Sequence, residues 1–452
     1  MMFVPLENTP MRYAWGAEGA ISDLLGTGGA LTEPERGAPR QAELWFGTHD
    51  GSPTRVASPE LTGGVATLRD WVAAEPDLAL GERALGVHAG PPRLPYLLKV
   101  LAAAKPLSLQ VHPNLAEARA GFAAENAAGV PIDAPHRNYR DALHKPELLV
   151  ALSETMSALA GFREPTEVRD LVDSIVEAAD ARGRAALEPF VTRVAAADSE
   201  AGMRDLLEWI LTSGEPAARA ADALDAWSAQ ETEEYAREQR NLARIRAEFP
   251  GDASALTALL MNHVVLHRGE ALYVRAGVLH AYLEGLGIEV MAASDNVLRG
   301  GLTVKHVDVP ELLRILDVAP TPPPVLAPGV RGNIAAFVPS EPDFMLQRAH
   351  AEGLDDELVC AGPGIALCVA GSVRLEGAGS GESKLLGRGD AVYVTPDEGS
   401  VRLRGRGDVL LATINPYAVA AEPAAPAESA EPAASAAPRE HAGAGRAEDS
   451  QA

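Results

Sequence analysis

An abrupt change of hydrophobic periodicity near the middle of the chain constrains the fold more than any other feature. Within residues 164–251, apolar side chains recur at intervals of three and four, which is the period of an amphipathic helix. Gly183, Gly202, Gly214 and Pro216 interrupt this pattern, so it predicts several short helices and not one coiled coil. The segment therefore predicts a compact, all-helical insertion.

Short apolar runs bounded by Gly, Pro and Asp lie on both sides of the helical segment and are typical of β-strands. Those that flank it are residues 94–101, 107–112, 271–274 and 288–291. Further runs follow one another across glycine-rich turns; they are residues 365–369, 373–375, 391–394, 401–403 and 409–414. Such spacing predicts a β-barrel or a sandwich. We therefore expect a mainly β protein with a helical insertion.

In chain order, these segments predict five regions. Residues 1–162 and 261–320 are the two parts of one catalytic β domain, and residues 163–260 are the helical insertion between them. Residues 321–417 are a second β domain. Residues 418–452 contain mostly Ala, Pro, Glu and Ser, which cannot offset the entropy lost on ordering. We expect this tail to be disordered and dispensable for activity.

Charge and cysteine usage exclude several classes of protein. The net charge of −24 leaves no broad basic surface for nucleic acid or anionic membranes, so local cations must hold any substrate phosphate. No apolar run reaches membrane-spanning length without a charge, and residues 1–15 contain no basic stretch that leads into an apolar run. Cys360 and Cys368 are too few for a secreted disulfide scaffold and lack zinc-like spacing. We expect a cytoplasmic protein that binds neither nucleic acid nor membranes.

The first segment with chemical potential is residues 106–113, where polar and apolar residues alternate. A strand here would place Ser108, Gln110 and His112 on one face. That face offers a hydroxyl, an amide oxygen and an imidazole, which suit a metal or a polar ligand. The alternative is an ordinary half-exposed strand.

The second segment is residues 144–147, with the sequence His-Lys-Pro-Glu. A two-residue period puts Lys145 and Glu147 on a common face, and a proline inside a strand implies an edge or a bend. Such a bend suits the opening of a site. The alternative is a surface turn with an ion pair.

The third segment, residues 269–282, predicts a strand, a tight glycine turn and a second strand that carries His280. Its spacing resembles the second metal motif of cupin barrels, with Arg275 where that motif usually has proline. Gly277 supplies the permissive backbone, so the substitution should leave the turn intact.

Two imidazoles, one carboxylate and one amide oxygen together form a candidate site for a divalent metal. The predicted ligands are Gln110, His112, Glu147 and His280. Zinc is the first expectation, although the ligand types alone also allow iron or manganese. Because only one ligand is anionic, the site stays net positive and can polarise a carbonyl or hold an enediolate oxygen as a Lewis acid.

Lysine usage is an independent indication, because arginine has almost replaced lysine in this chain. Four of the five lysines flank the segments above. A generic surface cation would be arginine here, so we interpret Lys99 and Lys145 as site residues. The alternative is that their aliphatic stems pack against the core.

A fourth segment, residues 289–303, combines small and polar residues with the pair Gly300 and Gly301. Glycines let backbone approach a ligand closely, and Arg299 could bind a phosphate or neutralise a developing oxyanion. A polar loop with a capping residue is the alternative.

These segments, with residues 13–16 (Tyr-Ala-Trp-Gly) and 42–49 (Ala-Glu-Leu-Trp-Phe-Gly-Thr-His), closely resemble type I mannose-6-phosphate isomerases. The resemblance covers about residues 5–318, and several motifs in the same order distinguish it from a chance match. It implies two cupin-like β domains, of barrel or jelly-roll form, with an inserted helical domain. The C-terminal domain lacks clustered histidines, so it is expected to bind no metal.

The resemblance also implies a function, the zinc-dependent interconversion of mannose 6-phosphate and fructose 6-phosphate through an enediolate. It makes Gln110, His112, Glu147 and His280 the ligands of one zinc ion per chain, and it makes Arg299 the catalytic arginine. A base must move a proton between adjacent carbons, and Glu289 and Lys145 are candidates that the sequence does not rank. The implied substrate-binding residues are Ser108, Lys99, Tyr282 and Asp295. The expected partner is a small sugar phosphate, and we expect a monomer.

Two other functions are compatible with a metal-binding cupin. The first is an iron-dependent dioxygenase or epimerase that uses the same ligands. The lysines, Arg299 and the glutamine ligand suit a redox-silent phosphosugar site better. The second is a non-catalytic, sugar-phosphate-binding regulator, which would not need two candidate bases and Arg299.

Overall fold

The computed structural model describes residues 3–27, 39–230 and 232–418. The chain divides into two units, Met1–Val419 and Ala420–Ala452. The tail predicted to be disordered lies outside the described residues, apart from Ala418. Within the described ranges, no helix is long and apolar enough to cross a membrane.

The long strand β12 (His280–Ala292) organises the antiparallel strands that flank the helical insertion. Its second part pairs with β6 (Tyr96–Ala103) and β8 (Glu147–Ala151). Its first part pairs with β7 (Leu109–Val111) and β9 (Thr155–Phe162). The remaining strands of this sheet are β4 (Glu43–Phe46), β10 (Met261–His267), β11 (Ala271–Val274) and β13 (Leu298–Gly301).

Strand β12 changes partners at Gly285. The φ angle of this glycine is 129°, and a Cβ there would lie 2.7 Å from the Met156 side chain. Any side chain would therefore be strained and crowded, so the bend between the two layers needs glycine. The strands form antiparallel layers, which confirms the predicted mainly β fold with a helical insertion.

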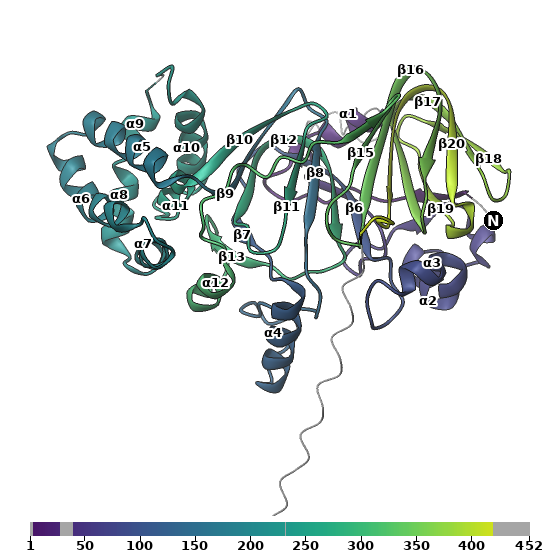
Figure 1. Cartoon of the computed structure of the whole chain (residues 1–452), viewed down its shortest axis with the longest axis horizontal. Coiled ribbons are helices and arrows are strands. Elements are labelled where there is room, and N and C mark those ends of the chain that lie inside the picture. The colour runs from purple at the N-terminus through teal and green to yellow at the C-terminus, as the bar shows by residue number, and fades with distance from the viewer. Residues whose placement is uncertain (1–2, 28–38, 231, 419–452) are drawn as a thin grey trace, which may run out of the picture. The chain divides into compact units, whose positions relative to one another are not determined.

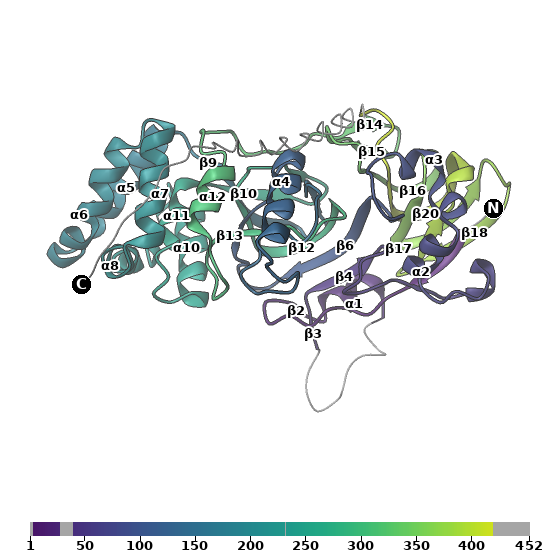
Figure 2. The same cartoon turned by 90° about the horizontal axis from the view of Figure 1, so that it is seen from below.

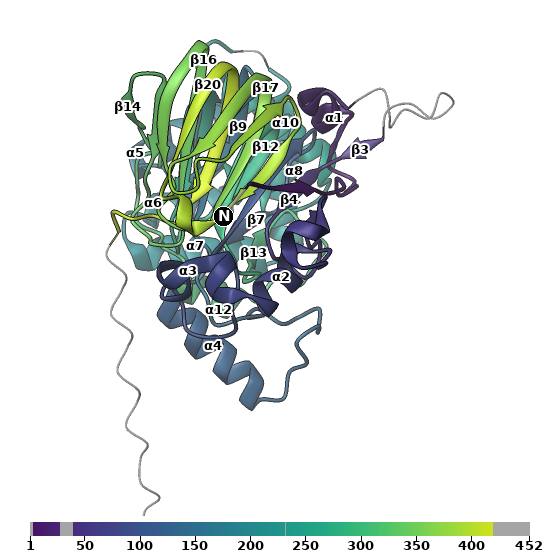
Figure 3. The ribbon, with the colours of Figure 1, turned by 90° about the vertical axis from the view of Figure 1, so that its right-hand side faces the viewer.

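A second sheet contains the C-terminal strands and two strands from the start of the chain. In order it comprises β14 (Gly329–Arg331), β15 (Ile334–Phe337), β16 (Met345–Val359), β20 (Ser400–Thr413), β17 (Gly364–Gly377), β19 (Ala391–Val394), β1 (Phe3–Glu7) and β5 (Arg55–Val56), with β18 (Ser383–Gly387) beside β17. Figure 3 shows β16, β20 and β17 side by side. The pairing of β1 with β19 was not anticipated from sequence, and the domain boundaries at 162 and 320 stay predictions.

Strands β17 and β20 are each longer than the sequence predicted. Residues 365–369 and 373–375 belong to one strand, as do residues 401–403 and 409–414. A glycine-rich turn was expected between these runs, at Gly371, but this glycine lies beside a register shift in the pairing of β17 with β20. Its φ is 74°, and a Cβ would lie 2.2 Å from a backbone oxygen of β20. It therefore permits a β-bulge inside a continuous strand.

Over its described residues, the predicted helical insertion is a cluster of seven helices. They are α5 (Pro165–Ala178), α6 (Ala181–Ala196), α7 (Glu200–Thr212), α8 (Glu215–Asp222), α9 (Asp225–Ser228), α10 (Ala236–Glu248) and α11 (Ala255–Leu260). They gather on one side of the sheet organised by β12, next to β9 and β10 (Figure 1, Figure 2). Gly183 and Gly202 lie inside first turns, not between helices, and the breaks fall at the capping residues Asp180 and Ser199.

Shorter elements complete the structure. They are α1 (Ala20–Leu25), α2 (Leu68–Ala74), α3 (Pro76–Leu85), α4 (Leu115–Ala127), α12 (Val309–Ile315), the two-stranded pair β2 (Ala17–Glu18) and β3 (Arg40–Gln41), and 3-10 turns at Pro59–Thr62 and Pro396–Glu398. One apolar cluster contains Val100 of β6 and Ile288 of β12 together with Ile365 and Leu410 from the C-terminal sheet. The two β regions therefore share a core.

Candidate metal centre

Three buried side chains converge at the ends of β7, β8 and β12. His112 follows β7, while Glu147 and His280 begin β8 and β12. The Nε2 of His112 lies 3.1 Å from Oε1 of Glu147, and the Nε2 of His280 lies 3.2 Å from Oε2. All three offer ligand atoms within 4.8 Å of one another. The structure thus brings together three of the four predicted metal ligands.

The surroundings fix both imidazoles in the form that binds a metal. Nδ1 of His112 lies 2.7 Å from the carbonyl oxygen of Asn296, and Nδ1 of His280 lies 3.1 Å from that of Val278. Donation of the Nδ1 proton to these carbonyls leaves a lone pair on each Nε2. Burial, and then the nearby Lys145, lower the pKa of His112 to about 4, so this ring is neutral at neutral pH.

A cation would satisfy an otherwise unfavourable contact in this cluster. Nε2 of His112 is buried without a hydrogen-bond partner and faces an oxygen of Glu147. With the ring proton on Nδ1, two acceptors oppose each other, which a buried site does not tolerate without a positive charge between them. Two imidazole nitrogens and a carboxylate oxygen are a donor set that suits zinc. These residues therefore fit a divalent metal.

Gln110 is the central residue of β7 and lies beside the cluster. Its Cα partners are His280 on β12 and Arg299 on β13. Side chains of directly paired residues lie on the same face of a sheet. The amide of Gln110 thus shares a face with one histidine of the cluster, and its role as the fourth ligand stays a prediction. Next to it, Nη1 of Arg299 donates to Oγ of Ser108 at 2.8 Å.

Two buried lysine–glutamate pairs extend the cluster. Nζ of Lys145 lies 2.9 Å from Oε1 of Glu147, and Nζ of Lys99 lies 3.0 Å from Oε2 of Glu289. Lys99 and Glu289 are direct cross-strand partners on β6 and β12. The same lysine lies 5.2 Å from the ring centroid of Trp45. The ion pair with Glu289 and the aromatic contact explain why its cation is buried and not exposed.

Burial and neighbouring charges give these groups different protonation tendencies. Burial raises the pKa of Glu289, and the carboxylate of Glu147 adds to the effect. For Lys99, burial opposes protonation, but the surrounding carboxylates, Glu289 foremost, raise its pKa above the ordinary value. For Glu147, burial is outweighed by Lys145 and His112, which lower its pKa. Glu289 is thus the carboxylate of this group that accepts a proton most readily.

Tyr282 and Asp295 lie at different depths. The hydroxyl of Tyr282 is buried and donates to Oε2 of Glu147 at 3.4 Å, and burial raises its pKa well above the ordinary value. The side chain of Asp295 is half exposed and lies 2.8 Å from Nε2 of His49. Asp295 lines a cavity of about 400 Å³ together with Arg93 and Arg140. Asp295 therefore belongs to the wall of this cavity, which we name the entrance, and not to the buried cluster.

Sequence reasoning missed two cations next to Arg299. The pKa of Lys305 is lowered mainly by Arg299 and burial, with Arg140 adding to the effect. Burial lowers the pKa of Arg299, and Arg140 lowers it further. Across the described residues, none of these three cations is paired with a carboxylate. Cations that influence one another in this way, without a carboxylate partner, favour the binding of an anion. The only sequence signal of Arg140 is its position shortly before the His-Lys-Pro-Glu segment. Lys305, shortly after Gly301, is also one of the few lysines that flank the site segments.

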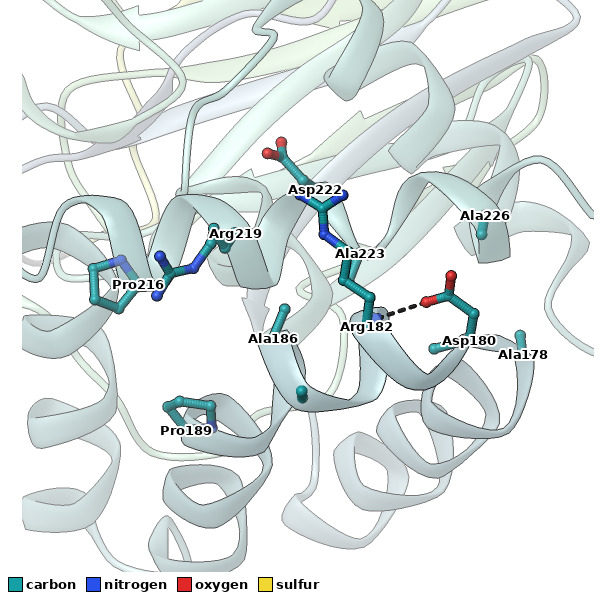
Figure 4. Close-up of a pocket in the computed structure, with 13 residues that line it drawn as sticks. Ala178, Asp180, Arg182, Ala186, Pro189, Pro216, Arg219, Asp222, Ala223 and Ala226 are labelled. Atoms are coloured by element: carbon teal, nitrogen blue, oxygen red, sulfur yellow. Dashed lines mark hydrogen bonds between the residues drawn. The ribbon is translucent and has the colours of Figure 1, made fainter.

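A cavity of about 670 Å³ lies away from these residues, within the helical insertion. Figure 4 shows that Pro189, Pro216 and several alanines line it, with Arg182, Arg219 and Asp222 among them. No group of three metal-ligating side chains of the described chain lines this cavity. This cavity therefore lacks the metal-ligating side chains that surround Glu147.

Comparison with known proteins identifies the family. A family model, the catalytic domain of type I phosphomannose isomerase, matches residues 3–165. The mannose-6-phosphate isomerase of Escherichia coli (strain K12) is 34% identical over 407 residues, which cover 89% of this chain and 97% of the relative. The chain belongs to the type I mannose-6-phosphate isomerases.

More distant relatives and solved structures agree with this family. The mannose-6-phosphate isomerase of Bos taurus is 29% identical over 430 residues, which cover 90% of this chain and 97% of the relative. A crystal structure of a phosphomannose isomerase mutant from Salmonella typhimurium matches with a TM-score of 0.79 at 32% identity, covering 91% of this chain and 99% of that one. A zinc-bound mannose 6-phosphate isomerase matches with a TM-score of 0.78 at 33% identity, covering 91% and 99%. The predicted resemblance is confirmed.

Proposed function

We propose that this protein is a zinc-dependent aldose–ketose isomerase that interconverts mannose 6-phosphate and fructose 6-phosphate. The observation that carries this function is the buried cluster of His112, Glu147 and His280, in a chain of this family. Solved relatives are described as zinc bound. Family membership favours the isomerase over an iron-dependent dioxygenase or epimerase and over a sugar-phosphate-binding regulator.

The proposed zinc ligands and Arg299 have different roles at the reacting carbons. Gln110, His112, Glu147 and His280 would hold the zinc ion, which as a Lewis acid would polarise the sugar carbonyl. Arg299, held by Ser108, would place its guanidinium where negative charge develops on oxygen during enolisation. It does not act as the base, because a guanidinium stays protonated at any working pH.

Glu289 and Lys145 are the candidate bases for the proton transfer between adjacent carbons. Glu289 is supported by its burial, its raised pKa and its ion pair with Lys99. Lys145 is supported by its position 2.9 Å from Glu147. Exchange of the transferred hydrogen with solvent deuterium distinguishes them, because loss of the base stops exchange as well as turnover. We expect Glu289→Gln to stop exchange, and continued exchange in this variant would favour Lys145.

The substrate phosphate would bind to the cations around Arg299. Arg140 and Lys305 are unpaired with carboxylates across the described residues, although the chain has a net charge of −24. A local positive site in an acidic protein suits a doubly charged phosphate. Ser108, Lys99, Tyr282 and Asp295 would contact the sugar from the inner wall and the entrance.

An assay of the purified protein with mannose 6-phosphate tests this function. We expect formation of fructose 6-phosphate, loss of turnover after chelation, and recovery when zinc is returned. Full activity after exhaustive chelation would exclude the role of zinc. Mannose without the phosphate serves as the control substrate, and we expect its turnover to be far lower because the cationic site is then unused.

We further propose that the protein acts as a cytoplasmic monomer with the domain boundaries predicted above. Both cysteines are free and buried, which fits a reducing compartment. Light scattering should give a mass near 47.3 kDa, and a mass twice as large would contradict the monomer.

A further inference from the structure

A second histidine–carboxylate cluster lies outside the proposed catalytic site. It consists of His88, which follows α3, His144, which precedes β8, and Asp343, which precedes β16. Nε2 of His88 lies 2.5 Å from Oδ1 of Asp343, and Nε2 of His144 lies 2.8 Å from Oδ2. The two rings meet edge to face, with centroids 5.5 Å apart. Three segments distant in sequence thus meet at one carboxylate.

This arrangement repeats that of the proposed catalytic ligands. In both clusters, one carboxylate presents one oxygen to the Nε2 of each of two imidazoles. In both, the candidate ligand atoms lie within 4.8 Å of one another. These are the two groups of this kind across the described ranges. The second cluster thus offers the same donor set, two imidazole nitrogens and a carboxylate, which suits a divalent ion.

The charge at Asp343 needs compensation. This residue is 0% exposed, and its carboxylate partners within the described chain are the two imidazoles, with no Lys or Arg ion pair. A buried carboxylate is costly unless a positive charge neutralises it. A metal ion held by all three side chains would supply that charge.

We propose that His88, His144 and Asp343 bind a second divalent transition-metal ion, with zinc favoured by the ligand types and water completing the coordination. Asp343 leads into the C-terminal sheet, and His144 leads into β8 of the catalytic strands. The ion therefore joins the two β regions. Its role is structural and is separate from the proposed catalysis.

The metal content of the full-length protein tests this site without any variant. The protein is saturated with zinc, transferred to metal-free buffer and analysed by mass spectrometry for zinc per chain. We expect two zinc ions per chain. One ion per chain would overturn the second site, and the three side chains would then form only a hydrogen-bonded triad.

Variants assign each ion to its cluster. We expect His88→Ala to retain one zinc ion and near-normal turnover, and His112→Ala to retain one ion without turnover. The matched control is His350→Ala, because this exposed histidine also faces an aspartate, Asp408 at 3.4 Å, and should retain two ions. If His88→Ala does not fold, Asp343→Asn takes its place. Two ions in folded His88→Ala would contradict the assignment.

Metal content and activity also separate this site from the proposed function. One ion per chain with full isomerase activity overturns the second site alone. Two ions per chain without isomerase activity overturn the proposed function and leave the second site standing.

Discussion

Asn296 connects a proposed zinc ligand to the loop that carries Arg140. Its carbonyl oxygen lies 2.7 Å from Nδ1 of His112, while its side-chain oxygen accepts from the backbone N–H of Arg140 at 2.7 Å. Its side-chain nitrogen donates to the carbonyl oxygen of Leu143 at 2.8 Å. The side chain is fully buried, so these bonds are protected from water. Asn296 therefore orients a ligand and a cation together.

Replacement of Asn296 by alanine should weaken zinc binding without removing a ligand. Loss of groups that orient metal ligands typically lowers affinity by about 10- to 100-fold. Competition with a chromophoric chelator measures this affinity. The control is Asn333→Ala, because Asn333 is exposed and bonds Asp356 far from the cluster. Unchanged zinc affinity in folded Asn296→Ala would show that the contacts do not orient His112.

Arg299→Ala should lose turnover but keep zinc. Removal of one group that stabilises a developing oxyanion costs about 100- to 1000-fold in kcat. Steady-state kinetics and zinc content are measured on the same preparation. Arg404→Ala, an exposed arginine of β20, is the control. Near-normal turnover in Arg299→Ala would remove the proposed role of this residue.

A neutral histidine lies where the helical insertion meets the sheet. Nε2 of His263, on β10, lies 3.0 Å from the carbonyl oxygen of Ala258 on α11, and Nδ1 lies 3.2 Å from Nδ2 of Asn241 on α10. Burial and then the charge of Arg163 lower the pKa of His263 to about 4, although Glu238 opposes this. The junction thus depends on an uncharged ring.

This junction should weaken as the pH falls. The folded-state pKa is below the unfolded value of about 6.5, so the unfolded chain binds the proton first. The stabilisation is complete above pH 6.5 and is lost as the pH falls towards 4. Between pH 7 and 5, the wild type should lose about 2 kcal/mol more unfolding free energy than His263→Gln. Urea denaturation measures this difference; His350→Gln, an exposed control, should behave as the wild type. Equal losses in wild type and His263→Gln would contradict it.

For helices, strands and their residues, the limits of sequence-based prediction have physical causes. Helical and strand periodicity predicted the insertion and most strands, because these patterns are local. Gly371 was misinterpreted because a turn and a bulge need the same positive φ. The separate motifs of His112, Glu147 and His280 predicted a shared metal site from their ligand types, and the family resemblance implied the same residues. The role of Asn296 could not be predicted, because one of its two links is a backbone carbonyl, which any residue has.

Met1–Val419 and Ala420–Ala452 form separate units of the chain. Both β regions and the helical insertion fall within the first unit. The tail has few large apolar side chains, so by composition it adds little to any core. Activity and folding should therefore depend on the first unit.

A chain that ends at Ala418 should retain the activity and the melting temperature of the full-length protein, because it keeps every strand and helix of the described residues. Isomerase assays and thermal unfolding are the measurements. The contrasting control ends at Gly399 and lacks β20, which pairs with both β16 and β17. We expect this shorter chain to be insoluble. A marked loss of activity in the chain ending at Ala418 would assign the tail a role in function.

The pairing of β1 with β19 has a consequence for biosynthesis. Phe3 leaves the ribosome long before Val394, its cross-strand neighbour, has been made. At typical translation rates this interval is roughly 20–80 seconds, during which the first strand waits without its partner. We expect chaperones to bind a nascent chain whose first strand stays unpaired with β19 for this time. For the same reason, a gene fragment starting at residue 321 would lack β1 and β5 of this sheet. A synthetic peptide with the sequence of β1, the strand that pairs with β19, should increase its solubility.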